Sequence, residues 1–396
     1  LIEDTKAAMV YADHFNQVGE VRTNAPVIDY QLGSIRDDFE FGSVLFYRTS
    51  AVKEAVARMD VDYQYAGLYD LRLKVSQKGA LEHINEYLYY DVELDNRTTG
   101  EKNFDYVDPK NRGVQIEMEQ AATQHLKDIN GYLAPGFKDI DLQGGGFEYD
   151  ATVVIPCKNR VRTIGTAIKS ALSQVVKAPY KFNVIVVDDN SEDGSVDVIK
   201  SIVAEGHENL TYIAQDKTWH AIGGNWNVAL HHEKCGRFAI QLDSDDTYFD
   251  ENTVQKFIDA FHEQNCAMVV GTYQLTDFDG NMIPPGVIDH KEWTPDNGRN
   301  NALRIHGLGA PRGFYTPMLR TINFPTTKYG EDYAVGLRVS REYQIGRIYD
   351  VVYNCRRWDD NSDANCDIVT MNNNHLYKDR IRTWELKARI QMNEGK

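Results

Sequence analysis

Three carboxylates stand close together at the end of an apolar run, in the segment Gln241-Leu242-Asp243-Ser244-Asp245-Asp246. Carboxylates packed together repel one another unless a proton or a cation neutralises them. Hard divalent cations take oxygen ligands, so Asp243, Asp245 and Asp246 are predicted to hold Mn²⁺ or Mg²⁺. A cation held there could neutralise a bound diphosphate and stabilise it as a leaving group. A solvated acidic loop is the alternative interpretation of this motif when it is taken alone.

Two earlier apolar runs also end in polar residues. Ala151–Ile155 leads into Pro156-Cys157-Lys158-Asn159, and Asn183–Val187 leads into Asp188-Asp189-Asn190-Ser191. Helical patterns separate the runs, with apolar residues spaced three and four apart in 164–174 and 195–204. Strands that alternate with helices indicate an α/β sheet, in which ligands bind at the carboxyl ends of the strands. We therefore expect all three polar segments at one edge of the sheet.

Together, the three strand ends resemble the family 2 glycosyltransferases, in order and in spacing. The resemblance rests on Val153-x-Ile155-Pro156, Val187-Asp188-Asp189-x-Ser191 and Leu242-Asp243-x-Asp245-Asp246, and it covers Asp150 to Asn361. It implies the GT-A fold, a mixed and mostly parallel sheet flanked by helices. It also implies that a nucleotide-diphosphate sugar is bound at this edge, with Asp243 facing both the cation and the diphosphate.

The resemblance assigns binding roles to further positions. Pro156, Lys158 and Asp189 stand where the family holds the nucleoside. Asn225 and Asn227 follow Gly223-Gly224, where the family brings its backbone close to the phosphates and the sugar. Arg357 and Trp358 stand in place of the end of a Q-x-x-R-W motif, which implies a diphosphate contact for Arg357 and sugar stacking for Trp358. Many members of the family have a metal-binding His near this position, where this chain has Trp358.

An acidic pair, Glu331-Asp332, follows Lys328-Tyr329-Gly330 and opens a helical pattern. It resembles the family's E-D motif, whose Asp is the general base of inverting members. Asp332 is thus predicted to take the proton of an acceptor hydroxyl, with Glu331 beside it. Gly309–Tyr315 is predicted to help shape the sugar and acceptor pocket. The alternative is an acidic pair that only complements a helix dipole.

A repeat links the two ends of the chain. Residues 65–89 align without gaps on residues 329–353 at a constant offset of 264, and shorter matches join 8–10 to 267–269, 27–29 to 287–289 and 46–47 to 314–315. We interpret residues 1–95 as a copy of the rear half of the catalytic domain, although chance similarity between α/β segments is an alternative. Gly67-Leu68 replace the acidic pair in this copy, so it is predicted to be non-catalytic.

Four sections follow from these patterns. They are the partial repeat at 1–95, a helical linker at 96–149, a GT-A catalytic domain at 150–365 and a C-terminal helical tail at 366–396. Half a sheet leaves an open edge. We expect a preceding segment to cover that edge, or docking onto the catalytic domain or onto a second chain as a homo-oligomer.

Composition excludes several classes of function. The net charge of −16 opposes binding to nucleic acid. The five cysteines are odd in number, widely spaced and without a C-x-x-C, which speaks against a disulfide framework or a zinc site. With no apolar run of about 18 residues, we predict a cytoplasmic location, or a peripheral one at the cytoplasmic face of the membrane.

The main hypothesis is a metal-dependent, inverting glycosyltransferase with a UDP-sugar donor and a carbohydrate or glycolipid acceptor, acting in polysaccharide or glycoconjugate synthesis. One alternative is a degenerate nucleotide-sugar-binding or scaffold module without turnover. Another is a sugar nucleotidyltransferase, a class that needs a Gly-rich loop containing Arg after its first strand. The segment Pro156-Cys157-Lys158-Asn159 stands in that place instead.

Overall fold

The computed structural model describes residues 2–92, 111–216, 220–291, 293–358 and 367–395. The chain forms two compact units. Unit 1 comprises Leu1–Ala134, Glu292–His306 and Asn365–Lys396, and unit 2 comprises Pro135–Lys291 and Gly307–Ala364. This division differs from the predicted sections, because 292–306 and the C-terminal tail pack with the N-terminal residues. In the described ranges, no helix combines the length and the apolar character needed to cross a membrane.

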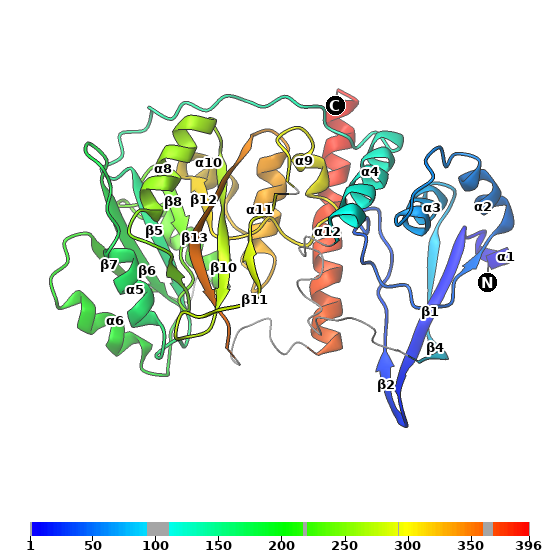
Figure 1. Cartoon of the computed structure of the whole chain (residues 1–396), viewed down its shortest axis with the longest axis horizontal. Coiled ribbons are helices and arrows are strands. Elements are labelled where there is room, and N and C mark those ends of the chain that lie inside the picture. The colour runs from blue at the N-terminus through cyan, green and yellow to red at the C-terminus, as the bar shows by residue number, and fades with distance from the viewer. Residues whose placement is uncertain (1, 93–110, 217–219, 292, 359–366, 396) are drawn as a thin grey trace. The chain divides into compact units, whose positions relative to one another are not determined.

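Unit 2 is built on one mixed sheet, whose strand order is β7-β6-β5-β8-β12-β10-β13-β9, with β11 beside β10 (Figure 1). Four strands from the N-terminal part of the unit run parallel to one another: β5 (Ala151–Cys157), β6 (Phe182–Asp188), β7 (Leu210–Ala214) and β8 (Phe238–Gln241). Every residue of β5 and β8 is buried, as the apolar runs predicted for strands covered on both faces. The predicted fold class, a mixed α/β sheet flanked by helices, is confirmed.

The remaining elements of unit 2 complete this sheet and cover it. The helices are α5 (Ile164–Leu172), α6 (Ser195–Val203), α7 (Ala221–His231), α8 (Thr253–Gln264), α10 (Thr316–Ile322) and α11 (Glu331–Ser340). The further strands are β9 (Thr247–Tyr248), β10 (Met268–Thr276), β11 (Met282–Ile288), β12 (Arg312–Tyr315) and β13 (Ile345–Arg356). The predicted apolar face of α5 is the buried one, with Ile164, Ala167, Ile168 and Ala171 inside.

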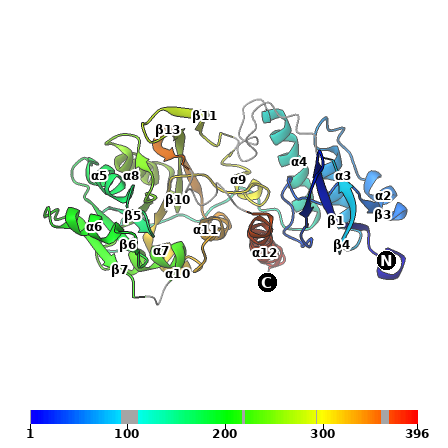
Figure 2. The same ribbon diagram turned by 90° about the horizontal axis from the view of Figure 1, so that it is seen from below.

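Unit 1 contains a smaller sheet of β1 (Met9–Val18), β2 (Val21–Ala25), β3 (Phe46–Tyr47) and β4 (Leu81–Asp91). Its helices are α1 (Ile2–Thr5), α2 (Thr49–Val56), α3 (Gly67–Ser76), α4 (Arg112–Asp128), α9 (Gly298–Asn301) and α12 (Ile368–Asn393) (Figure 2). Buried apolar side chains from β1, α2 and the loop before β3 form its core, including Met9, Tyr11, Phe39, Phe41 and Ala55.

The two sheets share one strand arrangement. β1 runs parallel to β4 with Met9 opposite Leu81, and β10 runs parallel to β13 with Met268 opposite Ile345. Both pairs shift register at equivalent residues, Asp13 in one and Thr272 in the other. The helices α3 and α11 have ten residues each and begin 264 residues apart.

One of the shorter sequence matches does not hold in space. The β1–β2 pairing places Ala25 opposite His14, and the β10–β11 pairing places Ile288 opposite Tyr273. The second strands of the two hairpins therefore correspond at an offset of 263, which differs from the offset of 260 that aligned 27–29 with 287–289. A loop of different length between the strands accounts for this difference.

The two copies differ at one edge. β12 lies between β10 and β8, whereas β3 pairs only with β1 among the described strands. Phe314 of β12 is 1% exposed and packs edge-on against Trp226 and Phe324. The pairing register also shifts the match of 46–47 with 314–315 by one residue, because Tyr47 lies opposite Met9 as Phe314 lies opposite Met268. Tyr47 is partly buried, whereas its neighbour Phe46 in β3 is 64% exposed. Phe314 and Phe46 therefore have opposite environments.

This contrast predicts different effects on stability. Phe314→Ala is expected to lower the free energy of unfolding by about 3–5 kcal/mol, because it leaves a cavity in a packed core. Phe46→Ala should change it by no more than about 0.5 kcal/mol, as is usual for an exposed site. Urea unfolding of both variants measures the difference, and equal losses would contradict the placement of Phe46 on an open edge.

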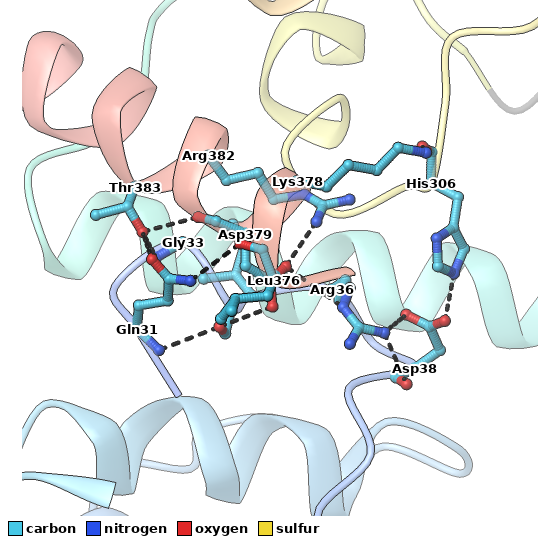
Figure 3. Close-up of polar contacts among 12 residues, drawn as sticks. Gln31, Gly33, Arg36, Asp38, His306, Leu376, Lys378, Asp379, Arg382 and Thr383 are labelled. Atoms are coloured by element: carbon cyan, nitrogen blue, oxygen red, sulfur yellow. Dashed lines mark hydrogen bonds and ion pairs between the residues drawn. The ribbon is translucent and has the colours of Figure 1, made fainter. Parts of the chain in front are cut away.

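The C-terminal helix α12 is an integral part of unit 1 (Figure 3). At Gly33, an added Cβ would lie 2.2 Å from the backbone nitrogen of Thr383, so the loop can approach the helix this closely only without a side chain. Ser34 Oγ donates to Asp379 Oδ2 at 2.9 Å, and Arg382 pairs with Asp379 Oδ1 at 2.7 Å. Hydrogen-bonded charges buried in this way fix the helix against the loop.

Candidate active site

The loops after β5 and β6 are tied together by hydrogen bonds. Lys158 Nζ donates to the carbonyl oxygens of Asp189 and, at 3.2 Å, of Asn190. The backbone N–H of Asn159 donates to Ser191 Oγ at 2.8 Å. The ammonium group of Lys158, predicted to face the nucleoside, thus stabilises the backbone of the loop that carries Asp189.

The two adjacent aspartates of this loop differ in their surroundings. Asp188 is buried, and its Oδ2 accepts a hydrogen bond from the backbone N–H of Ser191 at 3.1 Å. Asp189 is partly exposed, with Oδ1 3.9 Å from His220 Nδ1. Its side chain can therefore reach a ligand while Asp188 shapes the turn. Pro156, also predicted to face the nucleoside, is buried within β5 opposite Val187.

Gln241, the last residue of β8, holds the carboxylate of Asp243. Its Nε2 donates to both carboxylate oxygens at 2.9 Å, while the backbone N–H of Asp243 donates to Tyr353 Oη at 3.0 Å. Burial raises the pKa of Asp243, and the charge of Asp245 raises it further. A carboxylate in this position gains from a bound cation.

Asp246 is hydrogen-bonded to the end of β13. Its Oδ1 accepts a hydrogen bond from the backbone N–H of Arg356 at 2.7 Å, and burial, followed by the charges of Asp245 and Asp243, raises its pKa well above the usual range. Within the described residues, no group of three or more acidic, His or Cys side chains has a metal-binding arrangement. Asp243 and Asp245 fit a cation that takes its other ligands from diphosphate and water, as Mg²⁺ commonly does.

A cationic and aromatic rim adjoins Asp245. Its Oδ2 lies 3.5 Å from Arg160 Nε and 3.5 Å from Trp358 Nε1, so Trp358 neighbours the carboxylate without being able to ligate a metal. The guanidinium of Arg162 lies 5.1 Å from the Trp358 ring, and Phe278 meets that ring edge-on at 5.4 Å. The sequence analysis missed Arg160 and Arg162, although both follow Lys158 in one short basic run.

Arg357 follows the end of β13, and its backbone N–H donates to the carbonyl oxygen of Thr276 at 2.8 Å. This bond fixes the chain that carries Arg357 and Trp358 against the end of β10. The neighbouring Arg356, which the sequence analysis did not single out, donates from Nε to the carbonyl oxygen of Asp245 at 2.6 Å. The end of β13 is thus fastened directly to the acidic loop.

The acidic pair occupies the first turn of α11, after Gly330 with a φ of 74°. Glu331 is buried, and burial followed by the charge of Asp332 raises its pKa to about 8. Asp332 is less buried, and its Oδ2 forms an ion pair with Arg312 Nη2 at 2.6 Å. At neutral pH, Glu331 therefore mostly keeps its proton, while the guanidinium favours the ionised form of Asp332.

This pKa predicts how stability depends on pH. The folded-state pKa of Glu331 lies above its ordinary value of 4.5. Its contribution to the free energy of unfolding is therefore complete below pH 4.5 and is lost as pH rises towards 8, by on the order of a few kcal/mol. Glu331→Gln, which stays neutral, should flatten this window in urea unfolding at pH 5 and pH 8. An equally steep loss in the variant would contradict the assignment.

The asparagines of α7 form hydrogen bonds within the protein. The amide of Asn227 donates to the carbonyl oxygen of Phe324 and accepts from its N–H, both at 2.8 Å. Asn225 Oδ1 accepts from Gln215 Nε2, and both asparagines are buried. An added Cβ on Gly223 would lie 2.0 Å from the carbonyl oxygen of Pro325. This glycine therefore lets α7 approach the backbone of Pro325 closely. The resemblance had implied a close approach to the phosphates of the donor instead.

The chain was compared with known proteins and structures. Residues 152–323 match the family described as Glycosyl transferase family 2. A poly(ribitol-phosphate) beta-glucosyltransferase of Bacillus spizizenii is 25% identical over 213 residues, 52% of this chain and 32% of that protein. An uncharacterized glycosyltransferase of Haemophilus influenzae is 23% identical over 198 residues, 50% of this chain and 74% of that protein.

Solved structures of similar chains include S. aureus TarS 1–349 in complex with UDP-GlcNAc. It has 22% sequence identity and a TM-score of 0.46, covering 61% of this chain and 73% of that one. The mannosyltransferase PcManGT from Pyrobaculum calidifontis, in complex with GDP-Man and Mn²⁺, has 14% identity and a TM-score of 0.41, covering 72% and 85%.

The stretch from 152 to 323 is therefore a family 2 glycosyltransferase domain, as the sequence motifs predicted. It runs from β5 to the end of α10 and includes 292–306, which belongs to unit 1. The chain spans about a third of the length of the Bacillus spizizenii relative.

Proposed function

We propose that unit 2 transfers a sugar from a nucleotide-diphosphate donor, a UDP-sugar, to a hydroxyl of a carbohydrate or glycolipid acceptor, with inversion at the anomeric carbon. The observation that carries this proposal is a chain of contacts. Arg312 pairs with Asp332 at 2.6 Å and lies 3.2 Å from Gln241, which donates to both oxygens of Asp243, so the acidic pair of α11 and the carboxylates after β8 belong to one site. A diphosphate-sugar site needs both groups around one anomeric carbon.

The roles follow from the surroundings of each group. Asp332, kept ionised by Arg312, would accept the proton of the acceptor hydroxyl as its oxygen attacks the sugar. Asp243 and Asp245 would hold Mn²⁺ or Mg²⁺, which neutralises the departing diphosphate. Arg160, beside Asp245, can bind a phosphate oxygen through its guanidinium. Asp189 would accept a hydrogen bond from the nucleotide base.

A donor screen tests this function. The protein is incubated with UDP-, GDP- and dTDP-sugars, with Mn²⁺, Mg²⁺ or EDTA, and the release of nucleoside diphosphate is measured. We expect release from UDP-sugars that requires the divalent cation. If no donor is turned over or bound in any of these conditions, the proposal is overturned.

A further inference from the structure

The side chains of Gln241 and Arg312 link the carboxylates of Asp243 and Asp332. Arg312 opens β12, and its Nη2 lies 2.6 Å from Asp332 Oδ2. Its Nε donates to the carbonyl oxygen of Gly309 at 2.6 Å, and its backbone N–H and Nη1 both lie 3.2 Å from Gln241 Oε1. The guanidinium thus contacts Gly309, Gln241 and Asp332 at the same time.

Gln241 completes the chain towards Asp243. Its Nε2 donates to both oxygens of the Asp243 carboxylate at 2.9 Å, and the residue is 6% exposed. Its amide has one orientation that fits. Turning it over would place the amide oxygen against the carboxylate and the NH₂ group against the guanidinium, which makes both contacts repulsive.

We infer that Gln241 and Arg312 are positioning residues that fix Asp243 and Asp332 relative to each other. This inference rests on the proposed function, in which Asp243 faces the donor diphosphate and Asp332 faces the acceptor. In-line attack requires the base and the leaving group on opposite sides of one carbon, so a small error in their separation lowers the rate. Because β8 and β12 are neighbouring strands, the sheet supplies a rigid base for this spacing.

The chain also explains why glutamine and arginine stand at these positions. A neutral amide can donate to a carboxylate at one end and accept from a guanidinium at the other, which neither a carboxylate nor an ammonium group can do. Only arginine can contact Gly309, Gln241 and Asp332 together, because its five N–H donors form a planar fork, whereas lysine presents a single point charge. The sequence analysis placed Arg312 within the pocket-forming Gly309–Tyr315 but gave Gln241 no role.

Kinetics on the whole chain test the inference. Arg312→Met should lower kcat for transfer about 10- to 100-fold while the donor KM and the Mn²⁺-dependent affinity for UDP stay near wild type, since Gln241 keeps its bonds to Asp243 and to the backbone N–H of residue 312. Arg312→Lys should recover only part of kcat. Gln241→Met should weaken UDP and Mn²⁺ binding as well, because it releases Asp243. The double variant should lose less than the product of the single losses, because both residues act in one chain.

A matched control lies on the same helix as the acidic pair. Arg338 on α11 forms a 2.6 Å ion pair with Glu342, which follows the end of the helix, so Arg338→Met removes an ion pair of the same length outside the site and should leave kcat unchanged. Urea unfolding of every variant separates a loss of folded protein from a loss of rate. The inference is overturned, and the proposed function is not, if kcat is unchanged in Arg312→Met. The same holds if the loss in the double variant equals the product of the two single losses. A wild-type chain that neither binds nor turns over a donor overturns the proposed function, and the inference with it.

Discussion

Asp332→Asn is expected to lower kcat by about 10²- to 10⁴-fold, the usual contribution of a general base. The amide matches the carboxylate in size but cannot accept the proton of the acceptor hydroxyl. The affinities for UDP and Mn²⁺ should stay near wild type, because Asp332 faces the acceptor side and pairs with Arg312. Steady-state kinetics measure the first effect, and calorimetric titration of UDP with Mn²⁺ measures the second.

The partial repeat supplies a control for this variant. Leu68 stands on α3 where Asp332 stands on α11, at the offset of 264, and it is 81% exposed. Leu68→Asn introduces the same amide at the equivalent position and should leave kcat unchanged. Unimpaired turnover in Asp332→Asn would remove Asp332 from the role of base.

The fold of unit 2 could be predicted because its signals are local. Continuous apolar runs marked β5, β6 and β8, and each strand contains or overlaps the run predicted for it. A strand buried on both faces needs apolar residues at consecutive positions, and this requirement can be read within a short stretch of sequence. The same local logic placed Asp189 and Asp243 in the loops that follow β6 and β8, the two strands that flank β5 in the parallel part of the sheet.

The parts that could not be predicted depend on partners far apart in the chain. Nothing near Asn227 indicates that its amide bonds to the backbone of Phe324, 97 residues later. The inclusion of 292–306 in unit 1 depends on contacts such as the ion pair between Arg304 and Asp37, which lie 267 residues apart. In the sequence Gln241 is an ordinary strand residue, and its contact with Arg312, 71 residues later, exists only in the folded chain. Such side-chain contacts follow from the finished fold and leave no periodic signal.

The two copies place negative charge at a helix N-terminus in different ways. The N-terminus of a helix presents unpaired N–H groups and favours negative charge. In unit 2, Glu331 and Asp332 lie in the first turn of α11. In unit 1, Glu117 from α4 accepts hydrogen bonds from the N–H groups of Tyr65 and Ala66 at the start of α3, at 2.6 and 3.1 Å. The acid in unit 1 therefore comes from a second helix, whereas the acids of α11 belong to the helix itself.

Asp245→Asn is expected to produce the second large loss. Asp243 and Asp245 are the carboxylates proposed for the cation, since Asp246 is engaged with the backbone of Arg356. Replacing a group outside the ligand shell commonly lowers metal affinity about 10- to 100-fold, so losing a ligand should weaken Mn²⁺-dependent UDP binding by at least about 100-fold.

Metal removal and restoration measure this effect. EDTA should abolish release of nucleoside diphosphate by the wild type, and added Mn²⁺ should restore it. Asp245→Asn should stay inactive at the Mn²⁺ concentration that restores the wild type, because one carboxylate holds the cation too weakly. Asp250→Asn is the matched control, since Asp250 pairs with Lys256 at 3.2 Å and lies outside the proposed ligand set. Activity that survives EDTA in the wild type would mean that the arginines near Asp245 neutralise the diphosphate without a metal.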